Sequence, residues 1–363
     1  MARKPNAWSD LLDACCREGP RLSANKSRLR RLASIVICTR NRAAYLERTI
    51  REAAAQTLSS GEFEIVVVDN GSTDSTPEIF RKCQSAITMI PLRYVVEGEV
   101  GLSAARNRAI GEAGGEIVCF LDDDAVPEPG WLEWLIRGYG CESSVMCVGG
   151  AITPVYEGGV PAWFPPKLEF TFKPELRGAG LHRVTYPLYP YGANFSIRAE
   201  AVRRVGGFNT SLGYKGRELI PSEETEFLLR IEKAGYDILM ESRALVRHII
   251  PASRLTPAYL RLHAYSGGRG RALLENLHEI DSEEGEALIC RLRELAAVGG
   301  RRLRLRYRYW PERVLHSRTN QRQAVQRQCE LAAALGYCDQ QWKIGWRRLW
   351  VRGGCRGENR GPS

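Results

Sequence analysis

The sequence predicts an α/β fold with an open, doubly wound and mostly parallel sheet flanked by helices. Within the first 125 residues, four short apolar segments alternate with stretches of helical composition, and this alternation is typical of βαβ units. Each apolar segment ends in polar residues, and sheets of this kind bind ligands at the carboxyl ends of their strands. The length of 363 residues, 44% of them hydrophobic and 26% charged, is ordinary for a globular protein.

The four strands are inferred from short β-rich runs that stop at polar residues. They are expected at residues 34–38, 64–68, 92–96 and 116–121. Helices are expected over residues 43–55, from Pro77 and from Ser103. Ser75 or Thr76 is the expected cap of the helix that Pro77 begins.

The second half of the chain has a less regular pattern. Residues 151–190 are rich in proline and aromatic residues and lose the alternation. Regular elements are expected to return in NFSIRAEAVRRVGGF (194–208), in an amphipathic helix within SEETEFLLRIEKAGY (222–236) and in a last strand at 244–250. Beyond Thr256 the composition is mostly helical.

Composition and the first residues favour a protein that stays inside the cell. The 11 cysteines are an odd number without a CxxC pair or clustered histidines, so reduced thiols are expected rather than zinc or disulfides. No uncharged apolar run reaches the roughly 18 residues of a membrane-spanning helix. Asp10 and Asp13 stand where a signal peptide needs an apolar core. We therefore expect a cytoplasmic protein.

The net charge of +10 is concentrated at the end of the chain. Residues 301–363 hold 15 Lys and Arg against 4 Asp and Glu. RRLRLRYRYW (301–310) alternates basic with apolar residues, and in QQWKIGWRRLWVR (340–352) the three tryptophans share one helical face. Such a tail suits an anionic membrane surface, for example the inner face of the plasma membrane. Docking of the tryptophans on the main domain is the alternative, and no recognisable RNA or DNA module supports a nucleic-acid partner.

FLDDDAVP is the strongest local signal of chemistry. Three carboxylates at one strand end repel one another unless a cation or strong donors offset their charge. A divalent metal held by Asp122 and Asp124, with substrate phosphates completing its shell, would do so. The alternative is a solvated acidic turn before Pro127.

Polar residues after the first two strands could bind a nucleotide. Asp69 ends the second strand, where a carboxylate can accept from a nucleobase imide or a ribose hydroxyl. An Asx turn through the following NGS is the alternative. Thr39, Asn41 and Arg42 follow the first strand and could hold a base and a pyrophosphate.

Arg106 and Arg108 occupy the first turns of an expected helix, where the macrodipole disfavours cations. A nearby anion is therefore needed, and both the aspartate cluster and a bound diphosphate are candidates. No GxGxxG or Walker lysine follows any strand, which argues against Rossmann dehydrogenases and P-loop NTPases.

Five segments appear in a characteristic order: SIVICTRNR, IVVVDNGSTDST, GLSAARNRAIGEAGGEIVCFLDDDAVP, GANFSIRAEAVRRVGGF and SEETEFLLRIEKAGY. In this order they resemble the family 2 glycosyltransferases of GT-A fold. The resemblance covers residues 33–272 and implies a glycosyltransferase domain, with a nucleotide-binding half (33–125) and an acceptor half (126–272). A basic lead-in (1–32) and a helical, Arg-rich extension (273–363) flank it.

The resemblance implies a nucleotide-sugar donor, Mn²⁺ or Mg²⁺ as cofactor, and transfer with inversion. Together with the residue patterns it gives the expected nucleotide-sugar-binding residues Thr39, Arg42, Asp69, Arg106, Asp122, Asp123 and Arg254. The implied metal ligands are Asp122, Asp124 and His248, and the implied catalytic base is Glu224. For His248 a structural role is the alternative, and for Glu224 a role in an N-terminal cap with Ser222.

Two positions depart from the family pattern. Cys38 replaces a proline that commonly precedes the threonine, and Glu224 replaces the usual aspartate of the base. The longer side chain shifts the reach of the carboxylate by about one C–C bond, so Glu223 and Glu226 remain alternative bases. The aromatic segment Trp163–Tyr191 lies where this fold often binds acceptors, but core or lid packing explains it equally well.

The expected function is therefore metal-dependent transfer of a sugar to a carbohydrate or lipid-linked acceptor, in the synthesis of a cell-surface polysaccharide or glycan. One alternative is a catalytically silent, nucleotide-binding partner that its tail recruits to membranes. Another is a nucleotidyltransferase, which also uses clustered aspartates but releases pyrophosphate.

Overall fold

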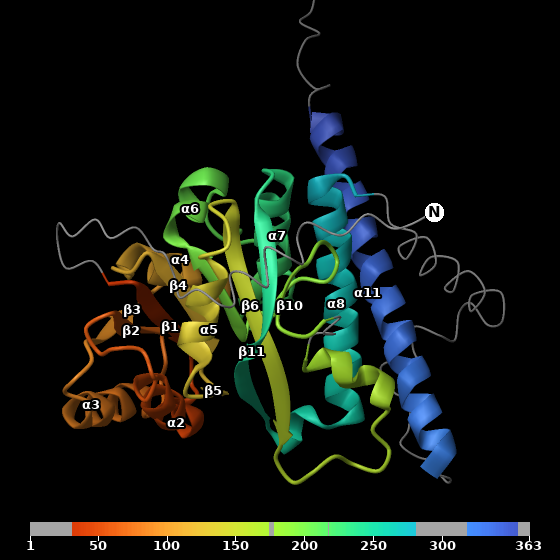
Figure 1. Ribbon diagram of the computed structural model, residues 1–363. Helices are drawn as coiled ribbons and strands as arrows, with labels where there is room; N and C mark the ends of the chain where they lie inside the picture. Colours follow the sequence, from red (N-terminus) through yellow and green to blue (C-terminus); the bar gives the residue numbers. More distant parts are fainter. Residues whose placement is uncertain (1–30, 174–177, 217, 281–317, 355–363) are drawn as a thin grey trace, which may run out of the picture. The chain divides into compact units, whose positions relative to one another are not determined.

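The computed structural model describes residues 31–173, 178–216, 218–280 and 318–354, which fall into two compact units (Figure 1). The first unit runs to Gly158 and also contains Glu169–Arg217 and Glu223–Pro251. The second contains Gly159–Leu168, Glu218–Ser222 and the chain from Ala252 onward. Most of the basic lead-in and the RRLRLRYRYW segment lie outside the described residues.

A mixed sheet of nine strands forms the centre of the first unit. Its strands are β1 (Ala33–Thr39), β2 (Phe63–Asp69), β3 (Leu92–Val96), β4 (Ile117–Asp122), β5 (Ala125–Pro127), β6 (Val145–Tyr156), β7 (Leu181–Arg183), β8 (Asn194–Arg198) and β11 (Asp237–Ile250). They lie in the order β3-β2-β1-β4-β8-β6-β11-β5, and β7 pairs with β11. The expected α/β class with a mostly parallel sheet is confirmed, and the first four strands end within one residue of their predicted limits.

Parallel pairing joins β3, β2, β1 and β4, and it also joins β6 to β11. β8 runs antiparallel between β4 and β6, and the short strand β5 runs antiparallel to β11. The carboxyl ends of β1, β2 and β4 therefore meet at one edge, where their polar loops gather.

The remaining elements are mostly helices. In the first unit these are α2 (Ala43–Ala54), α3 (Thr76–Ala86), α4 (Leu102–Glu112), α5 (Trp131–Gly138), α6 (Ala199–Val205) and α7 (Glu223–Lys233), with a short strand β9 (Gly213–Lys215). The second unit contains β10 (Glu218–Ile220), η2 (Ala252–Arg254), α8 (Pro257–His278) and α11 (Arg318–Gly354). The 3₁₀ helix η1 spans Pro166–Thr171.

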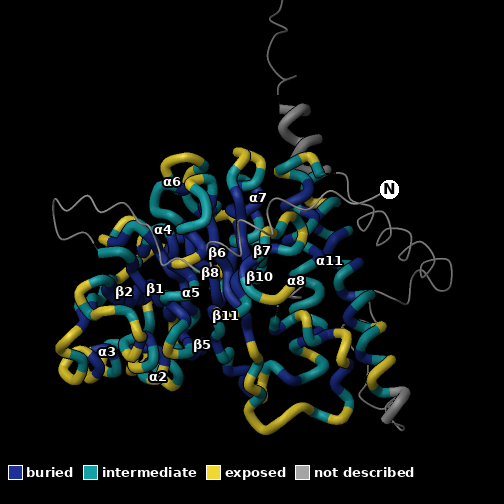
Figure 2. Tube along the Cα trace, in the orientation of Figure 1, coloured by how far each residue is buried: buried dark blue, intermediate teal, exposed yellow. Residues whose placement is uncertain are grey.

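Both faces of the sheet are buried, and each strand contributes apolar side chains to both of them because successive side chains point to opposite faces. Ile35 and Ile37 of β1 lie in one core cluster with apolar residues of α2, α3 and α5. On the other face, Phe120 of β4 stacks on Phe195 of β8 at 4.6 Å between ring centroids. Phe208 lies at the edge of that pair and stacks on a phenylalanine of α7. Figure 2 shows the strands of this sheet as mostly buried.

The turn after β2 differs from the prediction in its capping residue. Neither Ser75 nor Thr76 caps α3 through its side chain. Instead, Asp74 accepts hydrogen bonds from the backbone N–H of Thr76 at 3.1 Å and, through its other oxygen, from the N–H of Ala43 at 3.1 Å. One carboxylate thus serves the N-termini of α2 and α3, because a carboxylate offers two acceptor atoms.

β6 is the longest element that was not predicted. Its last residues fall in the segment 151–190, which was expected to be irregular. Gly149 and Gly150 interrupt its apolar pattern. A Cβ at Gly149 would lie 2.3 Å from Pro190, and one at Gly150 would lie 2.1 Å from the carbonyl oxygen of Ala244. Pro190 and Ala244 pack so close to the strand that only glycine fits at these two positions.

In the second unit, α8 and α11 pack side by side (Figure 1). α11 buries Val325, Cys329, Ala332 and Tyr337. The helices cross at glycines, since a Cβ at Gly268 would lie 1.9 Å from the carbonyl oxygen of Ala333. Among the described helices, none combines the length and hydropathy needed to span a membrane.

Candidate active site

The ladder between β5 and β11 brings the acidic segment beside His248. Asp122 is the last residue of β4, and β5 begins three residues later. His248 of β11 stands opposite Ala125 of β5, and the N–H of Ile249 donates to the carbonyl oxygen of Asp124 at 2.9 Å. Residues 124 positions apart are therefore held together by backbone pairing.

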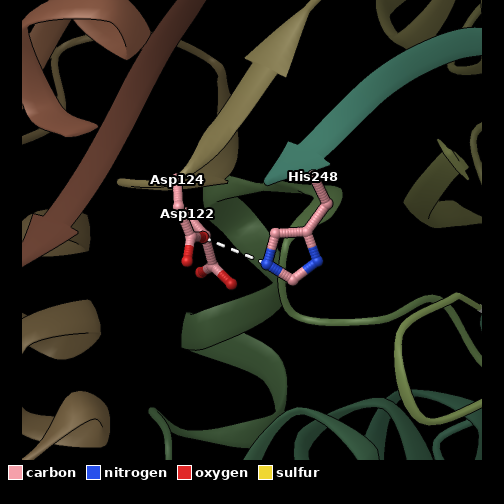
Figure 3. A group of neighbouring side chains, drawn as sticks. All are labelled: Asp122, Asp124 and His248. Carbon is pink, nitrogen blue, oxygen red and sulfur yellow. Dashed lines mark ion pairs between the residues drawn. The ribbon is translucent and has the colours of Figure 1, made fainter. Parts of the chain in front are cut away.

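Asp122, Asp124 and His248 form a group whose ligand atoms all lie within 4.8 Å of one another (Figure 3). His248 Nε2 lies 3.1 Å from Asp124 Oδ1. The side chain of Asp124 is 3% exposed and that of Asp122 36%, so the group opens to solvent on the Asp122 side. Two carboxylates and an imidazole are a donor set that Mn²⁺ accepts well.

His248 supplies the structural test of this fit. Both of its ring nitrogens are buried, and neither forms a hydrogen bond with any described residue. The contact of Nε2 with Asp124 is close enough for an ion pair but does not have hydrogen-bond geometry. An orphaned buried imidazole is costly as a purely structural group. Coordination of a cation by Nε2 would satisfy one of these nitrogens, so the residues fit a metal ion.

Asp123 points away from this group. Its Oδ2 accepts the Thr39 hydroxyl at 2.7 Å, and the Thr49 hydroxyl donates to its carbonyl oxygen at 2.8 Å. Burial, followed by the Asp124 carboxylate, raises the pKa of Asp123 to about 7, although Arg42 and the Thr39 hydrogen bond act in the opposite direction. A cation bound to the neighbouring Asp124 would lower the pKa of Asp123, because it would offset the second of these contributions.

Arg42 precedes α2 and contacts two of the aspartates. Its Nη2 donates to Asp124 Oδ2, and its Nε lies 3.4 Å from Asp123 Oδ1. The guanidinium also lies over the Tyr45 ring, 4.7 Å from the centroid. Its side chain is 24% exposed, so it reaches both the acidic group and the solvent side of the site.

Asp69 uses both carboxylate oxygens within the first unit. Oδ1 accepts the N–H of Ser72 at 2.8 Å, which is the turn that the sequence offered as an alternative to nucleotide binding. Oδ2 accepts the hydroxyl of Tyr94 on β3. Burial and the Asp69 hydrogen bond raise the pKa of Tyr94, so the phenol remains the donor. A role of Asp69 toward a nucleobase stays a prediction.

Arg106 lies near the expected aspartate cluster through Asp122, but its nearer anionic partner, Glu223, was not predicted. Arg106 Nη1 donates to Glu223 Oε1 at 2.9 Å, and each side chain is 3% exposed. Arg106 Nη2 lies 4.0 Å from Asp122 Oδ1. Arg108, in contrast, pairs with Glu112 at 2.9 Å on the same helix. A cation near the start of α4 indicated that an anion must lie nearby, but the sequence could not identify Glu223, which is 117 residues away.

Glu224 stands beside Glu223 in the first turn of α7. Its Oε2 is buried and finds no hydrogen-bond donor in the described part of the chain. Burial and then the Glu224 carboxylate raise the pKa of Tyr191 to about 12, which places that phenol near the carboxylate. Ser222 has a φ of 96°, so it lacks the extended backbone of the expected N-cap.

The other predicted residues are less informative. Both oxygens of Glu226 pair with Arg230 on the same helix, at 2.9 and 2.8 Å. Asn41 accepts the N–H of Thr73 at 2.7 Å and so joins two loops. Arg254 lies in η2 of the second unit, and its contact with a diphosphate stays a prediction.

Residues 34–202 match the profile of Glycosyl transferase family 2. The chain contains a family 2 glycosyltransferase domain. The chain is 26% identical over 261 residues to a glucosyl-dolichyl phosphate glucuronosyltransferase of Haloferax volcanii, an alignment that covers 70% of this chain and 81% of that protein. It is 34% identical over 209 residues to glycosyltransferase AglE of the same organism, covering 56% of this chain and 62% of that protein.

The glycosyltransferase also shares its fold with a solved structure, the mannosyltransferase PcManGT of Pyrobaculum calidifontis in complex with GDP-Man and Mn²⁺. The TM-score is 0.57 at 18% identity, over 93% of this chain and 94% of the other. This similarity confirms the expected GT-A type of fold. The assignment as a glycosyltransferase rests on the family match of residues 34–202, and the shared fold does not identify the donor, the acceptor or the metal.

Proposed function

We propose that this glycosyltransferase transfers a sugar with inversion from a nucleoside-diphosphate donor, using Mn²⁺ or Mg²⁺, to a lipid-linked or carbohydrate acceptor. The observation that carries the metal requirement is the convergence of Asp122, Asp124 and His248 within 4.8 Å, at the edge of the sheet where the polar loops meet. The nucleotide-binding mannosyltransferase of the same fold was solved with Mn²⁺, which supports the choice of metal.

The donor would lie along the carboxyl ends of β1, β2 and β4. Thr39 ends β1 and Asp69 ends β2, and Arg42 lies three residues beyond Thr39. A divalent cation bound by Asp122, Asp124 and His248 supplies positive charge against the departing diphosphate. Arg42 adds a fixed guanidinium that suits a phosphate oxygen.

Glu224 is the proposed base for the acceptor. Its carboxylate takes the proton of the acceptor hydroxyl while the acceptor oxygen forms a bond to the anomeric carbon. The bond from that carbon to the diphosphate breaks, and its electron pair leaves with the nucleoside diphosphate. Attack from the face opposite the leaving group inverts the anomeric centre. The buried, unpartnered Oε2 of Glu224 supports this role, because it is an acceptor without a committed donor.

The names of relatives suggest the acceptor class. The Haloferax volcanii protein that matches over 261 residues is named for a dolichyl phosphate-linked sugar. We therefore propose a lipid-linked acceptor, and a peripheral position at the cytoplasmic face of a membrane. Trp342 of α11 is 62% exposed and stands beside Lys343, which supports an interfacial role for the tail. The side chains of Trp346 and Trp350 lie outside the described residues.

Flotation on vesicles with and without anionic lipid would test the membrane contact. Because α11 packs on α8, the variant should be Trp342→Ser in the full chain rather than a truncation. Weaker flotation of the variant on anionic vesicles is expected, and equal flotation would contradict the membrane role of Trp342.

The catalytic proposal predicts the effect of Glu224→Gln. The amide cannot take the acceptor proton, so turnover should fall by about 10²- to 10⁴-fold, while Mn²⁺-dependent binding of the nucleoside diphosphate persists. Release of nucleoside diphosphate from a panel of UDP-, GDP- and dTDP-sugars measures turnover. A near-normal rate in the variant would remove Glu224 from the mechanism, and release of pyrophosphate would favour a nucleotidyltransferase.

A further inference from the structure

We propose that Arg106 and Glu223 are positioning residues, whose buried ion pair holds the first turn of α7, and with it Glu224, in place relative to Asp122. This inference rests on the proposed function, because it assigns a task to two side chains beside the proposed base. It also replaces the expected contact of Arg106 with the donor by a contact within the protein.

Both terminal nitrogens of the Arg106 guanidinium have acceptors within the protein. Nη1 donates to Glu223 Oε1 at 2.9 Å, and Nη2 lies 3.4 Å from the carbonyl oxygen of Gly192 and 4.0 Å from Asp122 Oδ1. One planar cation therefore joins α4, the start of α7, the loop before β8 and the end of β4. Arginine suits such a bridge because its donors stand in a fixed fork.

Aromatic rings surround the same group. The Cζ atom of Arg106 lies 5.5 to 6.0 Å from the ring centroids of Phe120, Phe195 and Phe208. The rings exclude water from the ion pair, and they also limit the directions in which the guanidinium can move. A charge pair in such surroundings is screened little and depends strongly on its geometry.

Gly192 allows the Arg106 guanidinium to lie close to the backbone, and a larger residue there would require the guanidinium to shift. A Cβ at Gly192 would lie 2.5 Å from Arg106 Nη2. Gly192 follows Tyr191, the phenol whose pKa the Glu224 carboxylate helps to raise. The loop that carries Tyr191 and the helix that carries Glu224 are thus both held by the same guanidinium.

Burial and then the Glu224 carboxylate raise the pKa of Glu223 to about 8, and Arg106 acts in the opposite direction. Burial alone would lower the pKa of Arg106, but the carboxylates of Glu223, Glu224 and Asp122 raise it. Arg106 is therefore within electrostatic reach of the proposed base and of a proposed metal ligand at the same time. With 3% of its side chain exposed, it is poorly placed to bind a donor phosphate directly.

The test compares Glu223→Leu and Glu223→Gln with a matched control on the same helix. Glu232 lies two turns further along α7, where its carboxylate accepts the N–H of Tyr186 at 3.0 Å and the Tyr189 hydroxyl. Glu232→Leu therefore removes a comparable set of hydrogen bonds from α7 without touching the first turn. Each variant is assayed for kcat and KM with the sugar nucleotide that the wild type uses, and for binding of the matching nucleoside diphosphate with Mn²⁺.

In Glu223→Leu, kcat should fall by about 100-fold, the loss that a 1 Å misplacement of a reacting group produces. KM and the dissociation constant of the nucleoside diphosphate should change by less than about threefold, because the donor site is not altered. Glu223→Gln keeps an acceptor for Arg106 Nη1 and should recover most of kcat. Glu232→Leu should lower thermal stability but leave kcat within about threefold of wild type.

If Glu223→Leu does not fold, Arg106→Lys gives the same information, because lysine keeps the charge but cannot bridge Glu223, Gly192 and Asp122 together. Its kcat should fall with nucleotide binding preserved. Loss of nucleotide affinity at unchanged kcat would show donor binding instead and overturn the inference. Equal losses of kcat in Glu223→Leu and Glu232→Leu would do the same. A wild type that turns over no donor would overturn the proposed function itself.

Discussion

At the scale of single residues, Arg42 and the expected metal share one carboxylate. Arg42 Nη2 donates to Asp124 Oδ2, while His248 Nε2 lies 3.1 Å from the other oxygen of the same group. A cation that binds Asp124 through Oδ1 would lie close to this guanidinium, so the two positive charges would repel each other and compete for one carboxylate. A displaced Arg42 would be free to meet the donor phosphates.

This competition predicts that Arg42→Ala binds Mn²⁺ more tightly in the absence of nucleotide, by about tenfold, which corresponds to about 1.4 kcal/mol. Binding of a nucleoside diphosphate to the Mn²⁺-loaded variant should be weaker than to the wild type, because a phosphate contact is lost. Isothermal titration with Mn²⁺ measures the first step, and titration of the Mn²⁺-loaded protein with the nucleoside diphosphate measures the second. Arg108→Ala, which breaks only the surface pair with Glu112, is the control. Weaker Mn²⁺ binding in Arg42→Ala would show instead that Arg42 supports Asp124.

The site was partly predictable at this scale. The acidic run indicated Asp122 and Asp124, the family resemblance added His248, and the structure brings their ligand atoms together. The direction of Asp123 was not predictable, because three successive carboxylates at a strand end give no indication of which one turns inward. The pairing of Arg106 with Glu223 was also not predictable, since it depends on how α4 and α7 pack across 117 positions.

At the scale of elements, strands marked by local sequence patterns could be predicted, whereas those that depend on long-range contacts could not. β1 to β4 follow from apolar runs that end at polar residues, and they lie within one residue of the predicted limits. β6 was missed because Gly149 and Gly150 interrupt its apolar pattern. Both positions require glycine because residues far away in the sequence pack closely against them. The pairing of β5 with β11, which places His248, involves only three residues of β5 and leaves little local signal.

The crossing of α8 and α11 predicts opposite effects for neighbouring glycines of α8. A Cβ at Gly268 would lie 1.9 Å from the carbonyl oxygen of Ala333, whereas a Cβ at Gly267 meets nothing within 4 Å. Gly268→Ala should therefore destabilise the helix pair by about 1–3 kcal/mol. Gly267→Ala should stabilise it by up to about 1 kcal/mol through helix propensity.

Denaturant unfolding followed by circular dichroism measures this difference. The two variants differ by one position in the same helix, so the composition and the charge of the chain are matched. Equal midpoints for Gly267→Ala and Gly268→Ala would contradict the close crossing of the helices.

At the scale of the whole molecule, the sequence separated a nearly neutral body from a basic end. The surplus of 11 positive charges over residues 301–363 lies in a region of which the structure describes α11, with side chains in only part of that helix, residues 321–344. That part of α11 packs on α8 and leaves Trp342 62% exposed, so packing and surface exposure occur in the same helix. Sequence alone could not assign these two roles, because both use tryptophan and arginine.

The central claim is that Asp122, Asp124 and His248 bind a divalent cation, which in turn binds the nucleoside diphosphate of the donor. Thermal unfolding of the full chain with UDP or GDP, with Mn²⁺ or with chelator, tests it most directly, because a ligand that binds the native state raises its stability. We predict that one of these nucleotides raises the unfolding temperature only with Mn²⁺, and that Asp124→Asn loses this increase. An equal increase in chelator, or in Asp124→Asn, would contradict the claim.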